Sequence, residues 1–484
     1  MLAVLLALLG TVPAGAHVGS PDVYAEGDAG PYKLFVTVRP PQVIPGVAEI
    51  EVRAATQGIT RIEVTPMPLT GEAALHPPVP DVMKQPSADP QFYTGHLWIM
   101  ATGSWQVRFT VTGSQGSGVV SIPLPATALT TLRMQPGLGG LLTLLCALLV
   151  LGLIGIVGAA AREALLPPGE SPAPRNRTKA RIAMAVTATI VATLLIFGNL
   201  WWRAEAKSYA GNVYKPLQMK ATLQTGNVMD LQLIDPGWLK QRRMDDFVPD
   251  HDHLMHLYAI RQPQMDVVFH LHPEQTGPGD FKLPLPTMPA GTYSLYADVV
   301  HANGFPETMV ATATVPFVAG RTLGPDEAEG TGTPVNTPNY KAAEFRLADG
   351  YRMIWKRPSA LHANKAEAFD FTLVDANGRR PADMALYMGM VGHAAFVKTD
   401  GTVFAHVHPS GTPSMAAMDI AAQQNGSNAM ANMPGMEAMP GMASSIPNTV
   451  TFPYGFPQPG EYRIFVQMKH GKDVETGIFD ALVQ

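Results

Sequence analysis

The sequence has a single cysteine and little charge, and these two shortages exclude several classes of protein. Cys146 is the only cysteine among 484 residues, and it lies inside an apolar run, so neither an internal disulfide framework nor a cysteine-based zinc site can form. Charged residues make up 15% of the chain, and the net charge is −5. Because a nucleic-acid partner needs a basic face, we expect no nucleic-acid binding.

Glycine and proline, by contrast, are frequent, at 45 and 44 residues. Together with many short runs of Val, Ile, Thr and Tyr, they favour a β-rich chain with many turns. We therefore predict a mainly β fold with several Ig-like antiparallel sandwich domains and a two-helix transmembrane hairpin.

Two long apolar segments carry no charge apart from Arg181 at the start of the second, and each exceeds the about 20 residues that a membrane-spanning helix needs. They predict transmembrane helices at residues 138–161 and 181–202. The intervening loop, residues 162–180, has more basic than acidic residues, so the positive-inside rule predicts that it is cytoplasmic. Both large domains would then lie on the periplasmic or extracellular side of a bacterial inner (cytoplasmic) membrane.

The N-terminal part has the pattern of an exported domain. Residues 1–16, "MLAVLLALLGTVPAGA", have the apolar core and small-residue end of a cleavable signal peptide. Residues 17–135 alternate like short strands and are punctuated by Pro and Gly, which predicts a small antiparallel sandwich. The stretch "GHLWIMATGSWQVRFTVTG" resembles YtkA-like/FixH-like periplasmic domains, which implies a β-sandwich exposed to the periplasm.

The C-terminal half is an internal duplication, with copy one at residues 203–319, a linker at 320–338 and copy two at 339–484. Copy one contains "HLYAIRQPQMDVVFHLHPE" and copy two contains "HAAFVKTDGTVFAHVHPS". In both copies a histidine precedes a His-x-His-Pro motif, and a Gly-x-Tyr later precedes another histidine by eight residues.

This repeated histidine pattern predicts metal binding. Side chains alternate along a strand, so His-x-His places both imidazoles on one face, about 6.6 Å apart. The upstream histidine would face them across a hairpin, and a fourth would arrive from a later strand. Three or four converging imidazoles suit copper or zinc. We predict one site per copy, with these ligands: His256, His270, His272 and His301, then His393, His406, His408 and His470.

Further histidines and methionines extend this prediction. His251 and His253, in "DHDHLMH", either extend the first site or only solvate a loop. Soft thioether ligands select Cu(I), so an evenly spaced methionine run in copy two favours copper over zinc, unless it only packs on a neighbour. Its "MPGM" repetition resembles Met-rich segments of bacterial copper-resistance proteins. The methionines of this run are Met430, Met433, Met436, Met439 and Met442.

A further candidate site lies at the predicted cleavage point. Cleavage after Ala16 would make His17 the N-terminus, whose free amine and ring nitrogen could chelate one copper ion. The stretch "HVGSPDVY" resembles the mature start of CopC-like copper carriers and of histidine-brace oxygenases. His96 could complete such a brace.

These observations predict a membrane-anchored periplasmic metal-binding protein that binds, buffers or delivers copper. Its expected partners are the membrane, metal ions and another envelope copper protein. No Ser/His/Asp set, paired carboxylate motif or phosphate loop stands out, so we expect no enzymatic activity. The alternatives are a zinc-binding version of the same module, a histidine-brace copper enzyme, and a structural or adhesive β-sandwich protein in which the histidines are incidental.

Overall fold

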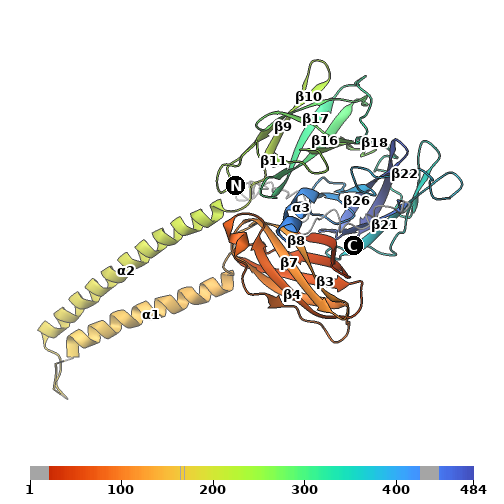
Figure 1. The fold of residues 1–484 in the computed structure, drawn as a ribbon. Helices are drawn as coiled ribbons and strands as arrows, with labels where there is room; N and C mark the ends of the chain where they lie inside the picture. Colours follow the sequence, from red (N-terminus) through yellow and green to blue (C-terminus); the bar gives the residue numbers. More distant parts are fainter. Residues whose placement is uncertain (1–20, 164, 168, 426–445) are drawn as a thin grey trace. The chain divides into compact units, whose positions relative to one another are not determined.

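Antiparallel sheets and one pair of long helices make up the protein, as described by a computed structural model that covers residues 21–163, 165–167, 169–425 and 446–484 (Figure 1). Strands account for 44% and helices for 18%, which confirms the predicted mainly β fold class. The chain divides into two units. One contains residues up to Thr127 together with Tyr214–Gln484, and the other is Ala128–Val213.

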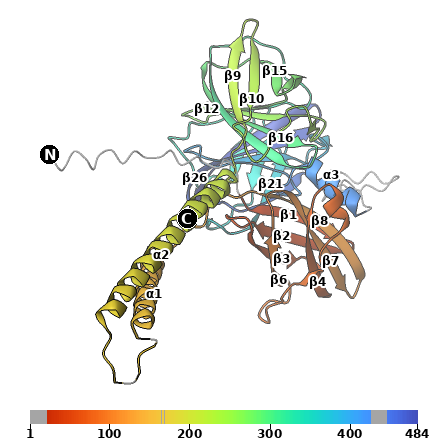
Figure 2. The ribbon, with the colours of Figure 1, turned by 90° about the vertical axis from the view of Figure 1, so that its left-hand side faces the viewer.

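The N-terminal domain is a sandwich of two four-stranded sheets (Figure 2). Burial alternates along its strands: in β3, for example, Ile50 and Val52 are buried whereas Glu49 and Glu51 point outward. The first sheet is β1 (Val23–Ala29), β2 (Tyr32–Arg39), β3 (Gly46–Ala54) and β6 (Phe92–Ile99). The second is β5 (Asp81–Val82), β4 (Ile59–Pro68), β7 (Gly103–Gly113) and β8 (Gly116–Ala126), and a short 3₁₀ turn, η1 (Glu72–Leu75), follows β4.

Helices α1 (Pro136–Glu163) and α2 (Pro174–Gly211) form the second unit. Both are long and apolar enough to cross a membrane, and they could form a transmembrane hairpin. Apolar side chains such as Leu149 and Leu194 remain exposed along them, as expected of surfaces that lipid would cover. The two helices pack closely at Gly158, where an added Cβ would lie 2.6 Å from the Met184 sulfur.

Each duplicated copy is also a two-sheet sandwich. In copy one the first sheet is β14 (Glu274–Gly277), β15 (Asp280–Pro284), β10 (Val228–Ile234) and β9 (Gln218–Gln224). The second is β11 (Phe247–Val248), β16 (Gly291–His301), β12 (His256–Gln262), β13 (Val267–Leu271) and β18 (Ala328–Thr331), with β17 (Pro306–Val315) paired to β16. Strand β18 lies inside the segment expected to be a linker. That segment has the composition of a loop, yet its backbone pairs with β13.

Copy two repeats this arrangement. Its first sheet is β19 (Glu344–Arg346), β20 (Arg352–Trp355), β21 (Glu367–Val374) and β25 (Thr449–Tyr454). The second is β22 (Met384–Ala385), β26 (Gly460–His470), β23 (His393–Lys398) and β24 (Phe404–Val407), with β27 (Asp473–Val483) paired to β26. The order β22-β26-β23-β24 matches β11-β16-β12-β13 strand for strand. Helix α3 (Met415–Gln424) follows β24 and begins at an N-cap, Ser414, whose hydroxyl accepts from the Ala417 amide.

The second sheets of the two copies face each other, so their strands are buried on both sides. In β12, Leu257 and Ala259 pack into the core of copy one, whereas Tyr258 and Ile260 pack into a shared core that includes residues of copy two. This explains why these strands are nearly continuously apolar instead of alternating with charged residues. We call this shared core the inter-copy core; its buried residues are Tyr258, Ile260, Met265, Val268, Tyr296, Ala395, Val397, Phe404, Phe465 and Ile478.

A buried arginine also joins the two copies. Arg463 of β26 forms an ion pair with Asp480, with nitrogen–oxygen distances of 2.7 and 2.9 Å. The same guanidinium donates to the carbonyl oxygens of Met265 and Thr333, which precede and follow strands of copy one's sheet. The ion pair with Asp480 holds the guanidinium inside copy two, and its two carbonyl hydrogen bonds tie β26 to the sheet of copy one.

Candidate metal centre

The strand alternation directs the predicted histidines into the space between the copies. His256 precedes Tyr258 by two residues, and His393 precedes Ala395 by two, so both share the face that forms the inter-copy core. The His-x-His pairs continue the same face beyond Val268 in β13 and beyond Phe404 in β24. The sites of the two copies are therefore neighbours rather than separate.

Three histidines of copy one form the first triad: His256, His270 and His272. One nitrogen of each lies within 4.8 Å of the others. His256 Nδ1 is 3.2 Å from both His270 Nε2 and His272 Nε2. Two nitrogens that bind one tetrahedral ion at 2.0–2.1 Å lie about 3.3 Å apart, so this spacing fits a shared metal ion.

The hydrogen bonds around the first triad determine which ring nitrogens carry protons. His256 Nε2 lies 2.9 Å from the carbonyl oxygen of Asp250, which can only accept, so Nε2 carries the proton and Nδ1 is a bare lone pair. His270 Nδ1 lies 2.9 Å from Gln467 Oε1 and 3.1 Å from Tyr387 Oη. Tyr387 donates its own proton to the Asp326 carbonyl, so both oxygens accept from His270 Nδ1.

His270 Nε2 is consequently a lone pair that faces another lone pair, His256 Nδ1, at 3.2 Å. Two facing lone pairs inside a protein repel unless a cation lies between them. The cation is not readily a proton, because burial, reinforced by neighbouring histidines, lowers the pKa of His270 and His272 well below the ordinary 6.5. Neutral imidazole is the form that binds a metal ion.

A second triad consists of His251, His393 and His408, again with one nitrogen of each within 4.8 Å of the others. His393 and His408 are buried, and none of their ring nitrogens has a hydrogen-bond partner; the same holds for His251 Nε2. Burial lowers the pKa of His393 and His408 well below 6.5. Buried polar atoms are normally paired, so these orphaned nitrogens fit a metal ion as the partner. The ligands cross the copies, since His251 comes from copy one.

His251 owes its place to the loop before β12. Its φ is 50° and that of Asp252 is 68°, both in the left-handed region that non-glycine residues rarely adopt. The loop is held by paired backbone hydrogen bonds between Asp250 and His253 and by the Asp250 carboxylate, which accepts from the Ala416 amide of α3 at 2.8 Å. Strained backbone that is held in this way often marks a functional position.

His406 lies between the two triads. Its ring centroid is 5.4 Å from that of His256 and 5.5 Å from that of His393, and its Nε2 is buried without a hydrogen-bond partner. We call the two triads and His406 the histidine centre. Rings of the two triads also approach each other directly, with His251 and His256 6.1 Å apart.

A duplicated contact supports this centre from outside. Asp298 of β16 pairs with His256, and Gln467 of β26 pairs with His393 at the equivalent register position. Each reaches a histidine of the opposite copy: Asp298 Oδ2 lies 3.4 Å from His406 Nδ1, and Gln467 Oε1 lies 2.9 Å from His270 Nδ1. Such outer contacts orient imidazole ligands and fix their tautomers.

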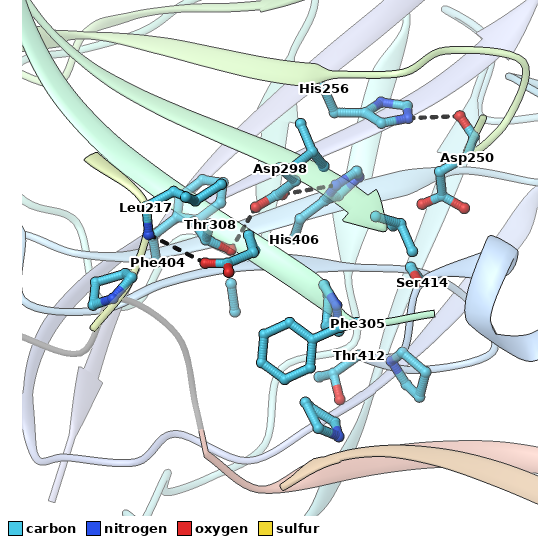
Figure 3. A pocket seen from close by; sticks show the side chains of 18 of the residues that line it. Leu217, Asp250, His256, Asp298, Phe305, Thr308, Phe404, His406, Thr412 and Ser414 are labelled. Carbon is cyan, nitrogen blue, oxygen red and sulfur yellow. Dashed lines mark hydrogen bonds and ion pairs between the residues drawn. The ribbon is translucent and has the colours of Figure 1, made fainter. Parts of the chain in front are cut away.

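A cavity of about 570 Å³ reaches the histidine centre (Figure 3). His256, His406 and His408 line it together with Asp250 and Asp298. Residues of the N-terminal domain, such as Asp22 and Thr127, also line this cavity.

His301 and His470 are placed elsewhere, so the structure does not bring together the expected four histidines per copy. His301 Nδ1 lies 2.8 Å from Asp246 Oδ1, and His470 Nδ1 lies 3.5 Å from Asp383 Oδ2. Each aspartate directly precedes the short edge strand that pairs with its histidine. The spacing shared by the copies thus reflects a repeated Asp–His contact at the end of the sheet, three residues beyond Asp298 or Gln467.

The remaining candidates lie outside the two triads. His253 stacks on His272, with centroids 3.7 Å apart, and its Nε2 lies 3.7 Å from Asp326 Oδ2. His96 is exposed on β6 of the N-terminal domain. The predicted signal peptide (1–16), His17 and the methionine run, Met430, Met433, Met436, Met439 and Met442, lie outside the described residues.

Sequence reasoning did not identify the supporting residues Asp250, Asp298, Gln467 and Tyr387. The repeat spacing in the sequence could have identified two of them, Asp298 and Gln467. Asp298 and Gln467 both stand five residues after the tyrosine of the repeated Gly-x-Tyr motif, so aligning the copies position by position would have paired them.

The sequence profile of a domain of unknown function, DUF8832, matches residues 215–316 and 346–484, which include every histidine of the centre. No curated protein matches the chain. Among solved structures, the Salmonella α2-macroglobulin reacted with methylamine is similar at a TM-score of 0.21 and 8% identity, covering 95% of this chain and 24% of that one. The chain thus spans about a quarter of that protein's length.

Two further similar structures contain extracellular modules. A bacterial ice-binding adhesin gives a TM-score of 0.14 and 6% identity, covering 91% of both chains. The ICAM-5 D1–D4 ectodomain fragment gives 0.16 and 8%, covering 94% of this chain and 77% of that one. At these TM-scores the likenesses support no inference about function.

Proposed function

We propose that this protein is a membrane-anchored metal-binding protein that binds copper in the histidine centre and buffers or delivers it. The observation that carries the proposal is the 3.2 Å separation of two buried ring nitrogens, His256 Nδ1 and His270 Nε2, whose rings each have an acceptor at the other nitrogen. A metal ion bound there would supply the positive charge that the neutral imidazoles lack.

The donor set favours copper, with zinc as the alternative. Both triads offer only imidazole nitrogen, which suits copper and zinc better than magnesium or calcium. For a given nitrogen site, divalent affinity peaks at Cu(II). The methionine run adds soft thioethers close in sequence to α3, whose first turn is bonded to Asp250 beside the centre.

The membrane location follows from the helices. Two helices that could span a membrane would anchor the protein, and we infer that the basic 162–180 loop is cytoplasmic and the sandwiches are periplasmic. The likeness of the N-terminal domain to YtkA-like/FixH-like domains agrees with that side. Neither predicted span, 138–161 or 181–202, contains an ionisable residue apart from the cysteine and the arginine at the start of the second, which argues against an ion path across the membrane.

Metal competition tests the choice of copper. The purified full chain, in detergent, is equilibrated with Cu(I), Cu(II) and Zn(II) together, and the bound metals are measured. We expect copper to displace zinc. A variant with Met430, Met433, Met436, Met439 and Met442 changed to Leu should lose Cu(I) affinity or transfer rate and keep its Zn(II) binding, because leucine preserves apolar volume and removes only sulfur. Preferential retention of zinc by the unaltered chain would refute the copper assignment.

A further inference from the structure

A second group of ligand-type side chains surrounds His470, and its chemistry differs from that of the histidine centre. His470 Nε2 lies 3.2 Å from Asp349 Oδ2 and 3.6 Å from Glu475 Oε1, and one atom of each residue lies within 4.8 Å of the others. Asp383 Oδ2 approaches the other ring nitrogen at 3.5 Å. The ring of Tyr351 stacks on His470, with centroids 4.1 Å apart, and fixes its plane.

The equivalent position in copy one shows what such a group needs. Glu307 pairs with Val299 one residue after Asp298, and Glu475 pairs with Met468 one residue after Gln467, so the two glutamates are equivalent. Glu307 is neutralised by Arg242, whose Nη1 lies 2.5 Å from its Oε1. Copy one thus supplies its own cation.

Copy two lacks that cation. In the part of the chain that the structure describes, no lysine or arginine forms an ion pair with Asp349, Asp383 or Glu475. Three carboxylates gather around one imidazole instead. Burial raises the pKa of Glu475, and the nearby Asp349 adds to this effect. Carboxylates that crowd together in this way repel one another unless a positive charge joins them.

His470 provides an independent indication. Its side chain is only 8% exposed, yet neither ring nitrogen has a hydrogen-bond partner. The equivalent His301, by contrast, has its Nδ1 hydrogen-bonded to Asp246 at 2.8 Å. A buried imidazole whose Nε2 lies 3.2 and 3.6 Å from two carboxylate oxygens has the arrangement of a metal ligand beside other ligands.

We propose that Asp349, His470 and Glu475, with Asp383 beside them, bind a divalent cation of the Zn(II) or Mn(II) class. One imidazole with two or three carboxylates is an oxygen-rich set that disfavours Cu(I), which prefers soft ligands. The cation plays in copy two the part that Arg242 plays in copy one. It joins the β19–β20 turn to the β26–β27 hairpin and so links the two sheets of this sandwich.

Mn(II) binding to the full chain in detergent tests the proposal. Mn(II) favours carboxylate ligands, and its free-ion EPR signal falls as it binds. The titration is made with His270, His272, His393 and His408 changed to Ala, so that Mn(II) bound at the histidine centre cannot contribute to the measured binding. We expect one Mn(II) equivalent in that background, and its loss when Asp349→Asn and Glu475→Gln are added.

Asp246→Asn is the matched control, because it alters the equivalent Asp–His contact in copy one, and it should leave Mn(II) binding unchanged. If the double variant fails to fold, Glu475→Gln alone is titrated, and it should bind more weakly. Absence of Mn(II) and Zn(II) binding in the four-alanine background, or binding that survives both carboxylate changes, would overturn this site. Either result would leave the proposed histidine centre unaffected.

Discussion

At the scale of single residues, the histidine centre is governed by where protons lie. The Asp250 carbonyl and the Gln467 amide oxygen accept hydrogen bonds from the outer nitrogens of His256 and His270, so the lone pairs of these two rings point inward. An aliphatic side chain at Gln467 would remove that constraint and leave His270 free to adopt the other tautomer. The tautomers of these two histidines therefore depend on residues outside the triads.

The buried histidines predict a pH-dependent stability. In the unfolded chain a histidine takes up a proton near pH 6.5, whereas burial lowers the folded-state pKa of His270, His272, His393 and His408. Below pH 6.5 the unfolded state binds more protons, so stability falls as pH falls, by up to about 1.4 kcal/mol per pH unit for each such histidine. Chemical denaturation in EDTA between pH 8 and 5 should show this loss.

Saturating metal should shift that loss to lower pH, because an ion competes with the proton for the same nitrogen. Exposed His76 offers a control, and His76→Gln should not change the profile. Greater stability of the metal-free protein at pH 5 than at pH 7 would contradict the buried, neutral state of these histidines.

We expect Asp298 to influence how tightly the histidine centre binds copper, through its contact with His406. Burial raises the pKa of Asp298 to about 6, so above that pH it is a carboxylate, which accepts a hydrogen bond from Thr308 Oγ1 at 2.6 Å and lies 3.4 Å from His406 Nδ1. Asp298→Asn removes the charge with little change of shape. It places an amide at this position of copy one, where copy two already has the amide of Gln467. We expect about tenfold weaker copper binding by competition titration, in line with outer-shell changes elsewhere. Unchanged affinity would exclude His406 from the site.

At the scale of strands and helices, period-2 alternation explains much of what the sequence could predict. It placed both histidines of each His-x-His on one face, and the fold class is confirmed. Alternation cannot tell which sheet covers that face. The partner of copy one's face is a strand of copy two more than a hundred residues away, so the sequence predicted one site per copy but not that the two triads lie next to each other.

The sequence could not decide whether His251 belongs to the site, and the reason is physical. Its direction depends on a left-handed turn that is held by α3, 166 residues away from Asp250 in sequence. Conversely, His301 and His470 recur at the same spacing because the sheet end is duplicated. The repeated spacing of His301 and His470 therefore reflects the duplicated end of the sheet and not membership of the two triads.

The helix pair gives a prediction at the same scale. An added Cβ on Gly158 of α1 would lie 2.6 Å from the Met184 sulfur of α2, so the Met184 side chain would have to move, whereas nothing lies within 4 Å of the position of a Cβ on Gly155. Gly158→Val should therefore weaken helix packing and lower the melting temperature in detergent, and Gly155→Val should not. Met184→Ala should restore part of the loss by making space. Equal effects of the two valine variants would exclude close packing at Gly158.

At the scale of the whole molecule, the two copies belong to one compact structural unit. Copy one supplies the whole first triad and His251 of the second, and copy two supplies His393 and His408 of the second. Asp298 of copy one contacts His406 of copy two, and Gln467 of copy two contacts His270 of copy one. An ion bound across the copies would stabilise their association, by about 2.7 kcal/mol at a free concentration of 100 times Kd. Isolated copies should therefore bind metal more weakly than the intact pair.

The proposed orientation of the chain rests on the basic loop between the helices. Reporter fusions at Glu170 and at the C-terminus should report opposite sides of the membrane, with Glu170 in the cytoplasm. The same side at both points would refute the predicted hairpin topology. A copper role outside the cytoplasm would lose its support with it.

The most direct test of the histidine centre is the amount of copper bound by the full chain and by variants of each triad. The unaltered protein should bind two copper ions at the centre. His270→Ala with His272→Ala should remove about one, and His393→Ala with His408→Ala should remove the other. His76→Ala with His362→Ala, at exposed positions, is the control and should remove none. Equal copper content in all four proteins would contradict the account.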